Sequence, residues 1–218
     1  MLKKVLEVKL DHNLEKEIIV VNDGSTDSTE DVLKKIAAGN SSIQIINLEK
    51  NTGKGASVRR ALLKVSGEIA IIQDADLEYD PDDYNKLLQF IVDDHADVVY
   101  GSRFIDLKPQ QAMFFSQRFS NKLLTFLSNI FTGFHLSDME TCYKMFKTEI
   151  LKQIQLKENR FGFEPEVTAK LSRIKNIRIC ETGIAYYGRS YSEGKKINWV
   201  DGFRAIWCIL KYNIFSRT

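Results

Sequence analysis

The stretch Ile69-Ala70-Ile71-Ile72-Gln73-Asp74-Ala75-Asp76 decides how this chain folds. Its first four residues form a short apolar run, as expected for a strand that is buried on both faces. Two acidic residues, separated by Ala75, follow after Gln73. Because open α/β sheets bind ligands at the carboxyl ends of their strands, we expect Asp74 and Asp76 to lie at a ligand-binding edge.

The segments on either side of this stretch continue an alternation of strands and helices. Strand-like runs occur at 18–21, 43–48 and 97–100, and helix-like segments separate them, including 54–65. This alternation predicts an α/β fold with a mostly parallel central sheet flanked by helices. The second half predicts different elements: an apolar-rich helix at 114–131, strands near 177–180 and 184–187, and a long aromatic helix at 199–215. No linker separates the halves, so we expect a single domain over 1–218.

The bulk composition excludes several classes of protein. The 218 residues are 44% hydrophobic and 28% charged, with a formal net charge of +2, so nothing indicates a nucleic-acid partner. The three cysteines, Cys142, Cys180 and Cys208, are scattered, which argues against a disulfide framework and favours a reducing, cytoplasmic location. No run of 18 uncharged apolar residues predicts a transmembrane helix.

Asp74 and Asp76 are candidate metal ligands. Two carboxylates that leave a strand together can both reach a hard cation, and Mg²⁺ or Mn²⁺ would keep positions open for phosphate oxygens. Such an ion would neutralise charge on a departing nucleoside diphosphate. The alternative interpretation is a helix cap or an acidic surface turn.

Two further motifs contain candidate ligand-binding residues. Asp23 follows the strand at 18–21, and its carboxylate can accept hydrogen bonds from a nucleobase or a ribose, although a plain turn residue is the alternative. In Asn51-Thr52-Gly53-Lys54-Gly55, two glycines allow close approach of a ligand to the backbone, and Lys54 adds a cation. The spacing matches neither a P-loop nor a dinucleotide-binding glycine motif.

Taken together, the motifs resemble the family 2 glycosyltransferases with the glycosyltransferase A fold, which are nucleotide-diphospho-sugar transferases. The closer similarity is to the polyprenyl-phosphate sugar synthases, the branch that includes the dolichyl-phosphate mannosyltransferases. The resemblance runs from about Glu17 to Tyr212. It rests on seven ordered motifs: VNDGSTD, NTGKGAS, QDADLEYDP, YGSRF, DMETCYKMF, NRFGFEPE and GRSYSEGKKINWVDGFRA.

The resemblance implies a nucleotide-sugar-binding half at about 17–105. In that half, Asp23 would contact the donor base, and Asp74 and Asp76 would hold the diphosphate and the metal. Glu78 lies where the family often has a further metal-side ligand. Lys54 would lie on the donor side, and Glu164 and Glu166, from the second half, would shape the pocket for the donor sugar.

The resemblance also implies an acceptor half at about 106–218. Arg103 and Arg118 would face a phosphate of either the donor or the acceptor, Asp138 would approach the sugar or the acceptor, and Arg189 with Lys195 and Lys196 would belong to an acceptor loop. A phosphate acceptor is already anionic near neutral pH and needs little help from a base. The resemblance implies direct attack on the anomeric carbon with inversion. Arg189→Ala is expected to weaken acceptor use far more than nucleotide binding.

Two other function classes stay open at this point. A sugar-phosphate nucleotidyltransferase uses a similar sheet, a metal and a nucleotide, but it needs a Gly-rich signature near the chain start. A non-catalytic or truncated nucleotide-sugar-binding protein of the same fold is the other alternative. The donor is equally open, since GDP-mannose and UDP-glucose both fit.

The two ends of the chain carry the last expectations. Apolar and basic residues in 199–215 favour peripheral contact with the cytoplasmic face of a membrane, and a core-packed helix is the alternative. At the start, Leu2, Val5, Leu6 and Leu10 resemble one face of a helix, although 5–10 could replace a strand. We therefore expect that the family's first strand is missing, and that the chain binds nucleotide poorly or compensates by forming a homo-oligomer.

Overall fold

The computed structural model describes residues 1–105, 115–188 and 199–216, and its strands form two sheets. The small sheet pairs β1 (Ile18–Asn22) in parallel with β2 (Ile43–Asn47). The large sheet has the order β3-β5-β4-β6, made of β3 (Ile69–Ile71), β5 (Lys144–Lys147), β4 (Val98–Ser102) and β6 (Ile179–Gly183). β4 and β6 are parallel, whereas β5 runs antiparallel to both β3 and β4. The predicted α/β fold is confirmed, with its strands divided between two sheets.

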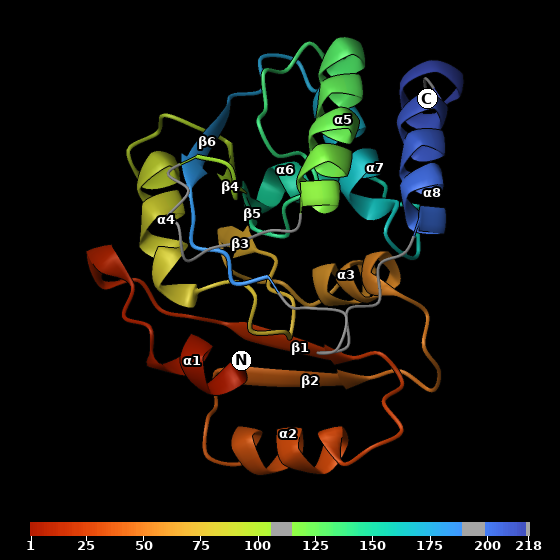
Figure 1. Cartoon of the computed structure of the whole chain (residues 1–218). Coiled ribbons are helices and arrows are strands. Elements are labelled where there is room, and N and C mark those ends of the chain that lie inside the picture. Colours follow the sequence, from red (N-terminus) through yellow and green to blue (C-terminus); the bar gives the residue numbers. More distant parts are fainter. Residues whose placement is uncertain (106–114, 189–198, 217–218) are drawn as a thin grey trace.

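Helices surround both sheets. They are α1 (Leu2–Glu7), α2 (Thr29–Ala37), α3 (Lys54–Leu62), α4 (Tyr84–Val92), α5 (Phe115–Thr132), α6 (Thr148–Gln153), α7 (Phe163–Leu171) and α8 (Trp199–Leu210). Shorter turns of helix span Asp11–Asn13, Pro81–Asp83 and Lys211–Phe215. Figure 1 shows α2 beside the small sheet, on the side far from β3 to β6, and α5 and α8 standing side by side. None of the described helices is both long enough and apolar enough to cross a bilayer.

The predicted elements agree with most of these positions. The runs at 18–21, 43–48, 69–72 and 97–100 correspond to the first four strands, and 114–131 corresponds to α5. The strand predicted at 184–187 is wrong: only Tyr186 makes an isolated bridge, to Tyr79, and the one strand here spans 179–183. The sequence pattern also left 143–146 unassigned, although it supplies β5 in the middle of the large sheet.

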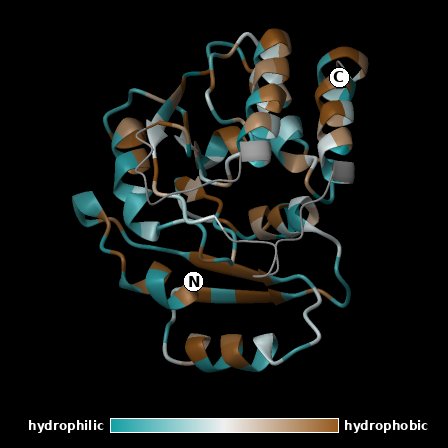
Figure 2. Cartoon of the chain, in the orientation of Figure 1, coloured by the Kyte–Doolittle hydropathy of each residue, from teal (hydrophilic) through white to brown (hydrophobic). Residues whose placement is uncertain are grey.

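The hydrophobic core lies on both faces of the large sheet. All five residues of β4 are buried. Val99 packs in a cluster with α4, and Val98 and Tyr100 pack in a second cluster with α5, α7 and α8, as the alternation of side chains along a strand requires. The small sheet is also lined with hydrophobic residues (Figure 2). The carboxyl end of β4 is therefore held rigidly between two packed layers.

The first 17 residues form no strand. α1 confirms the helical face predicted for Leu2, Val5 and Leu6, and the alternative in which 5–10 replaces a strand is wrong. Val5 packs into the cluster with α4. Glu17 then joins the two sheets, because its carboxylate accepts hydrogen bonds from the backbone N–H groups of Ser66 and Gly67 at 2.9 and 3.2 Å.

Candidate active site

The end of β3 is anchored to the hydrophobic core by Gln73. Its side-chain oxygen accepts hydrogen bonds from the hydroxyl groups of Tyr84 and Tyr143, at 2.8 and 2.6 Å. Both rings are buried, so Gln73 is tied into the core. The two acidic residues that follow lie nearer the surface: the Asp74 side chain is 34% exposed, and Asp76 is half-buried.

Lys54 connects two of the predicted site residues. Its Nζ lies 3.0 Å from Asp74 Oδ2 and 2.7 Å from Glu164 Oε1, so the motifs around residues 54, 74 and 164 meet at one ammonium group. Burial disfavours the charge on Lys54, but the two carboxylates outweigh it and raise its pKa well above the usual value. Burial likewise opposes ionisation of Asp74, and Lys54 reverses this, so the pKa of Asp74 is lowered. Asp74 is an anion held in place by a fixed cation.

Two further titratable residues, Glu140 and Lys144, lie close to this cluster and were not predicted. Burial, followed by the Glu164 carboxylate, raises the pKa of Glu140 to about 8, and burial lowers the pKa of Lys144 to about 8. The Lys144 ammonium donates to the Thr141 carbonyl and lies 4.8 Å from the centre of the Tyr100 ring. One oxygen each of Glu140 and Glu164 has no hydrogen-bond partner in the described structure. The only sequence signal was that Glu140 and Lys144 both belong to DMETCYKMF.

Asp23 closes the loop that follows β2. Its Oδ1 accepts from the Thr52 backbone N–H and hydroxyl at 2.7 and 2.8 Å, and its Oδ2 accepts from the Gly53 N–H at 2.7 Å. Both oxygens are thus used within the protein, and the contact with a donor base stays a prediction.

The glycines of this loop face the chain's own backbone. A Cβ at Gly53 would lie 2.5 Å from the Asn159 carbonyl oxygen, and one at Gly55 would overlap the Glu158 carbonyl oxygen. The sequence suggested that these glycines let a ligand approach the backbone closely. In the structure it is the backbone of the loop at 158–159 that lies against them.

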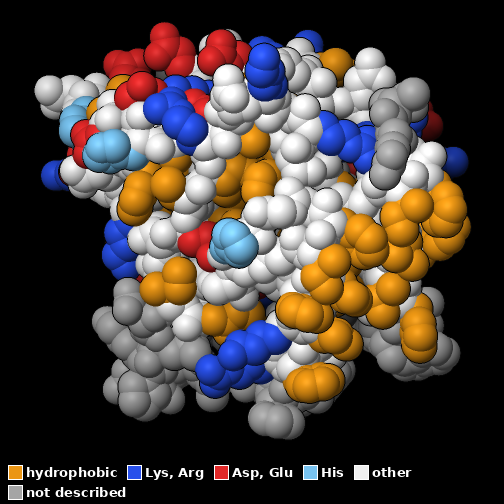
Figure 3. Space-filling view, turned by 90° about the horizontal axis from the view of Figure 1, so that it is seen from above, with side chains coloured by type: hydrophobic (Ala, Val, Ile, Leu, Met, Phe, Trp, Pro, Cys, Tyr) orange, Lys and Arg blue, Asp and Glu red, His pale blue; other side chains and the backbone are white. Residues whose placement is uncertain are grey.

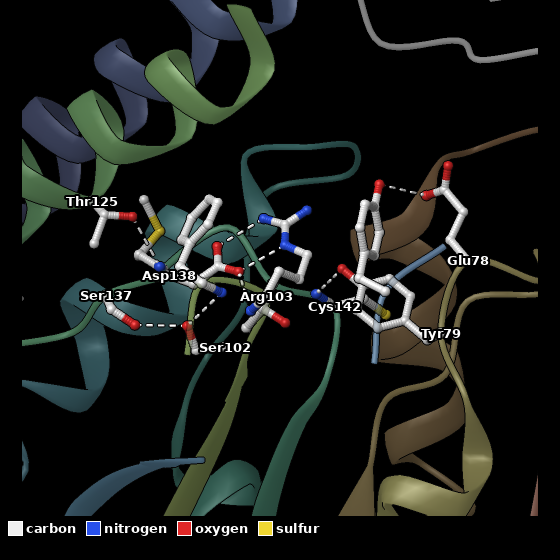
Figure 4. A network of polar contacts seen from close by, with 12 residues as sticks. Glu78, Tyr79, Ser102, Arg103, Thr125, Ser137, Asp138 and Cys142 are labelled. Atoms are coloured by element: carbon white, nitrogen blue, oxygen red, sulfur yellow. Dashed lines mark hydrogen bonds and ion pairs between the residues drawn. The ribbon is translucent and has the colours of Figure 1, made fainter. Parts of the chain in front are cut away.

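Arg103 and Asp138 form a buried, two-bond ion pair at the end of β4 (Figure 4). The guanidinium Nε and Nη2 each donate to the carboxylate at 2.7 Å, and the Arg103 backbone N–H donates to it at 3.0 Å. Burial opposes the charge of Arg103, but Asp138 outweighs it and raises the pKa of the guanidinium. Glu181 holds the loop that contains Asp138, because its carboxylate accepts hydrogen bonds from the backbone N–H groups of Ser137 and Asp138 at 2.6 and 3.0 Å.

Glu78 belongs to this second network. The Arg103 guanidinium lies 5.2 Å from the centre of the Tyr186 ring, and the Tyr186 hydroxyl donates to Glu78 Oε2 at 3.1 Å. Glu78 is buried. Its backbone N–H donates a hydrogen bond to Asp76 Oδ1 at 3.4 Å. Tyr186 and the neighbouring Tyr79, which accepts from the Cys142 N–H, are site residues that the sequence reasoning missed.

The remaining predicted residues lie apart from these networks. Glu166 is fully buried and accepts from the backbone N–H groups of Lys157 and Glu158, both at 2.7 Å, so it organises the loop before α7. Arg118 is exposed on α5. Arg189, Lys195 and Lys196 lie outside the described residues, so their roles in acceptor binding stay predictions.

The acidic pair after β3 fits a divalent cation. Mg²⁺ takes one or two carboxylates and completes its shell with phosphate oxygens and water, and Asp74 and Asp76 offer such a pair at a partly exposed position. In the described part of the chain, no group of three or more His, Cys, Asp and Glu side chains is placed to hold an ion. Glu78 Oε2 accepts a hydrogen bond from Tyr186, and the predicted role of Glu78 beside the metal stays a prediction, whereas Asp74 and Asp76 are the pair that would hold the metal.

Comparison with known proteins identifies relatives over almost the whole chain. Residues 1–155 match the family model described as glycosyl transferase family 2. The chain is 27% identical over 227 residues to a UDP-N-acetylglucosamine–dolichyl-phosphate N-acetylglucosaminyltransferase of Methanococcus voltae, covering 96% of this chain and 90% of the relative. It is 25% identical over 217 residues to a dolichyl-phosphate β-glucosyltransferase of Trichomonas vaginalis, covering 95% and 64%. A dodecaprenyl-phosphate galacturonate synthase of Rhizobium johnstonii is 25% identical over 202 residues, with 92% and 58% covered. The chain thus spans less than two thirds of the last two relatives.

A solved structure shows the same fold. Glucosyl-3-phosphoglycerate synthase of Mycobacterium tuberculosis aligns with a TM-score of 0.67 at 17% identity, covering 93% of this chain and 71% of that one. The same enzyme in complex with Mn²⁺, uridine diphosphate and phosphoglyceric acid also aligns with a TM-score of 0.67, at 18% identity, covering 93% and 69%. With the family model matching more than half of its length, the chain belongs to glycosyl transferase family 2 and is a glycosyltransferase of the glycosyltransferase A fold.

Proposed function

We propose that this glycosyltransferase moves a hexosyl group from a nucleotide-diphospho-sugar of the GDP-mannose or UDP-glucose type to a polyprenyl phosphate. The names of the three relatives support the acceptor, because each names a polyprenyl or dolichyl phosphate while the sugars differ. The donor sugar and base are correspondingly left open. Such an acceptor would bring the reaction to a membrane surface, and we propose that the chain makes peripheral contact with its cytoplasmic face.

One observation carries this proposal. β3 and β4 both run antiparallel to β5, so they point the same way and their carboxyl ends lie at one edge of the large sheet. That edge holds two carboxylates after β3, Asp74 and Asp76, and a buried guanidinium after β4, Arg103. Carboxylates suit a metal-bound diphosphate, and a guanidinium suits a phosphate monoester, so donor and acceptor groups can be accommodated one strand apart.

The charged residues have separate roles in this reaction. Asp74 and Asp76 would hold Mg²⁺ or Mn²⁺, which when bound supplies neutralisation of the leaving diphosphate. Lys54 keeps Asp74 ionised and in place. Asp138 accepts from Nε and Nη2 of Arg103 and so fixes the guanidinium at the end of β4, where we assign it to the phosphate of the acceptor.

The chemical step needs no general base. A phosphate oxygen of the acceptor forms a bond to the anomeric carbon, and the bond from that carbon to the diphosphate oxygen breaks, so the nucleoside diphosphate leaves with the electron pair. The attacking phosphate carries its own negative charge near neutral pH, since its second pKa is about 6. Positioning and charge neutralisation then supply most of the rate.

Radiolabelled donors test the proposal directly. The chain is incubated in detergent with Mn²⁺, a short polyprenyl phosphate and either UDP-glucose, UDP-N-acetylglucosamine or GDP-mannose, and the lipid product is separated by thin-layer chromatography. Label in the lipid fraction that depends on the lipid phosphate supports the proposal. Donor binding without any turnover would instead indicate the non-catalytic alternative, and formation of nucleotide-sugar from a nucleoside triphosphate and a sugar phosphate would indicate a nucleotidyltransferase.

A further inference from the structure

The outward face of α5 carries an apolar stripe. Phe119, Leu123, Phe126 and Ile130 follow a helical spacing of four, three and four residues, and all are exposed, Phe119 at 63% and Phe126 at 62%. The buried side of the same helix includes Leu124, Thr125 and Ser128. A helix that only packs on a core has its apolar stripe inward, whereas α5 has a second apolar stripe on its outward face.

The last helix repeats this pattern beside α5. Phe203 and Trp207 are exposed four residues apart on α8, and Ile214 and Phe215 are exposed in the turn of helix that follows, with the Phe215 ring centre 6.1 Å from that of Trp207; Trp207 is 55% and Phe215 69% exposed. A different set, Ala205, Cys208, Ile209 and Tyr212, packs into the protein. One face of this helix is therefore core-packed and the other is exposed, and its contact with a membrane stays a prediction.

The two stripes form one surface, which we call the α5/α8 face. α5 and α8 are in contact, and Figure 3 shows hydrophobic side chains gathered over one side of the molecule, with Lys and Arg side chains next to them. Large contiguous apolar patches are rare on monomeric proteins and mark sites of interaction. We therefore expect the α5/α8 face to bind a partner.

The charges around the face favour an anionic surface. α5 contains Arg118 and Lys122, both exposed, and no acidic residue. Aromatic and aliphatic residues combined with basic ones are typical of helices that lie in the headgroup region of a membrane. Each basic residue near an anionic bilayer contributes about 1 kcal/mol of attraction. A second copy of the chain would instead bring these cations toward one another.

The face is also continuous with the candidate active site. Phe104 lies between them: the Lys122 Nζ and the Arg103 guanidinium each lie 5.9 Å from the centre of its ring. A bilayer that covers α5 would thus bring lipid headgroups close to the guanidinium assigned to the acceptor phosphate.

We propose that the α5/α8 face docks on an anionic lipid bilayer, with the outward stripes of both helices inserted at headgroup depth. The choice of a bilayer rests on the proposed lipid-phosphate acceptor. Docking is nevertheless tested separately from transfer, because vesicle binding is measured without a nucleotide sugar and transfer is measured in detergent.

Vesicle co-sedimentation tests the face. The full chain is mixed with vesicles of phosphatidylcholine alone or with 30% phosphatidylglycerol. Wild type is expected to bind the anionic vesicles, and the double variant Phe126→Glu/Ile130→Glu is expected to bind about tenfold more weakly or worse, since burying one large apolar side chain alone provides about that factor. Leu63→Glu, at a residue 74% exposed on the far end of α3, is the matched control and should bind as wild type does.

Fluorescence keeps the test independent of that variant's folding. The sequence has two tryptophans, so Trp199→Phe leaves Trp207 as the only reporter. Its emission is expected to shift to the blue on anionic vesicles and to be quenched by lipids brominated on the acyl chain. Absence of vesicle binding by wild type, equal binding to neutral vesicles, or binding without quenching of Trp207 overturns the proposal. A dimer in solution that the double variant dissociates would show that a second copy covers the face, and it overturns the proposal too.

Discussion

Replacing Glu158 by Gln tests how α8 is attached to the rest of the molecule. The Glu158 side chain is 6% exposed; its carboxylate accepts from Lys211 and Tyr212 at 2.8 Å each and from Arg204 at 2.9 Å. Burial alone would raise its pKa, but these donors lower it from 4.5 to about 2. The whole shift corresponds to about 3 kcal/mol of stability at neutral pH. Because Arg204 and Lys211 are partly exposed and screened by water, we expect about 2 kcal/mol.

The pH dependence of this loss identifies its cause. A carboxyl group whose pKa is lowered by folding stabilises the native state above its unfolded pKa, and this contribution disappears as the pH falls through the folded value. Urea unfolding of wild type and Glu158→Gln should therefore differ by about 2 kcal/mol at pH 7, and the difference should shrink steadily from pH 4.5 toward pH 2. Glu149→Gln, at an exposed position on α6, is the control and should show no such change. If wild type and Glu158→Gln differed in free energy of unfolding by the same amount at pH 7 and pH 3, the electrostatic reasoning would be refuted.

Three further substitutions test the site itself. Asp76→Asn should lower transfer by about 100-fold or more with an unchanged melting temperature, and full activity of the variant, or of wild type in excess EDTA, would eliminate the metal. Asp138→Asn leaves the buried Arg103 without its ion pair, so thermal unfolding should show a loss of about 3–5 kcal/mol, and wild-type stability would contradict the pairing. Gly55→Ala places a Cβ on a backbone oxygen of the neighbouring loop and should cost about 1–3 kcal/mol in urea unfolding. Gly39→Ala, which meets nothing within 4 Å, should stay within about 0.5 kcal/mol, and similar losses in both variants would remove the steric explanation.

The sequence predicted the elements of the fold better than their pairing. Apolar runs such as 69–72 identify buried strands because burial on both faces excludes polar residues. β5 was not predicted as a strand because its first residue is a fully buried lysine, Lys144. Charged residues almost never occupy such positions. The direction of β5 follows from long-range packing, which no local pattern records.

The candidate site shows the same limit. The position of Asp74 at a strand end was predictable from the period of the sequence. Its partner Lys54 was identified as a cation for the donor, but the structure joins it to Asp74 and Glu164, residues 20 and 110 positions away. Residue types predicted a chemistry for each group, whereas the pairs they form depend on how the chain folds back on itself.

The division of the strands into two sheets has a consequence for how the molecule opens. In the described part of the chain, β1 shares a backbone ladder with β2 alone, and the small sheet is joined to β3 at one end by the Glu17 side chain. Two strands by themselves are marginally stable. Separating this unit from the large sheet breaks no ladder between the described strands, so we expect it to cost less free energy than opening β4. A donor that contacts both Asp23 and Asp74 would act as a clamp across the two sheets, so that substrate binding itself completes the rigidity of the enzyme.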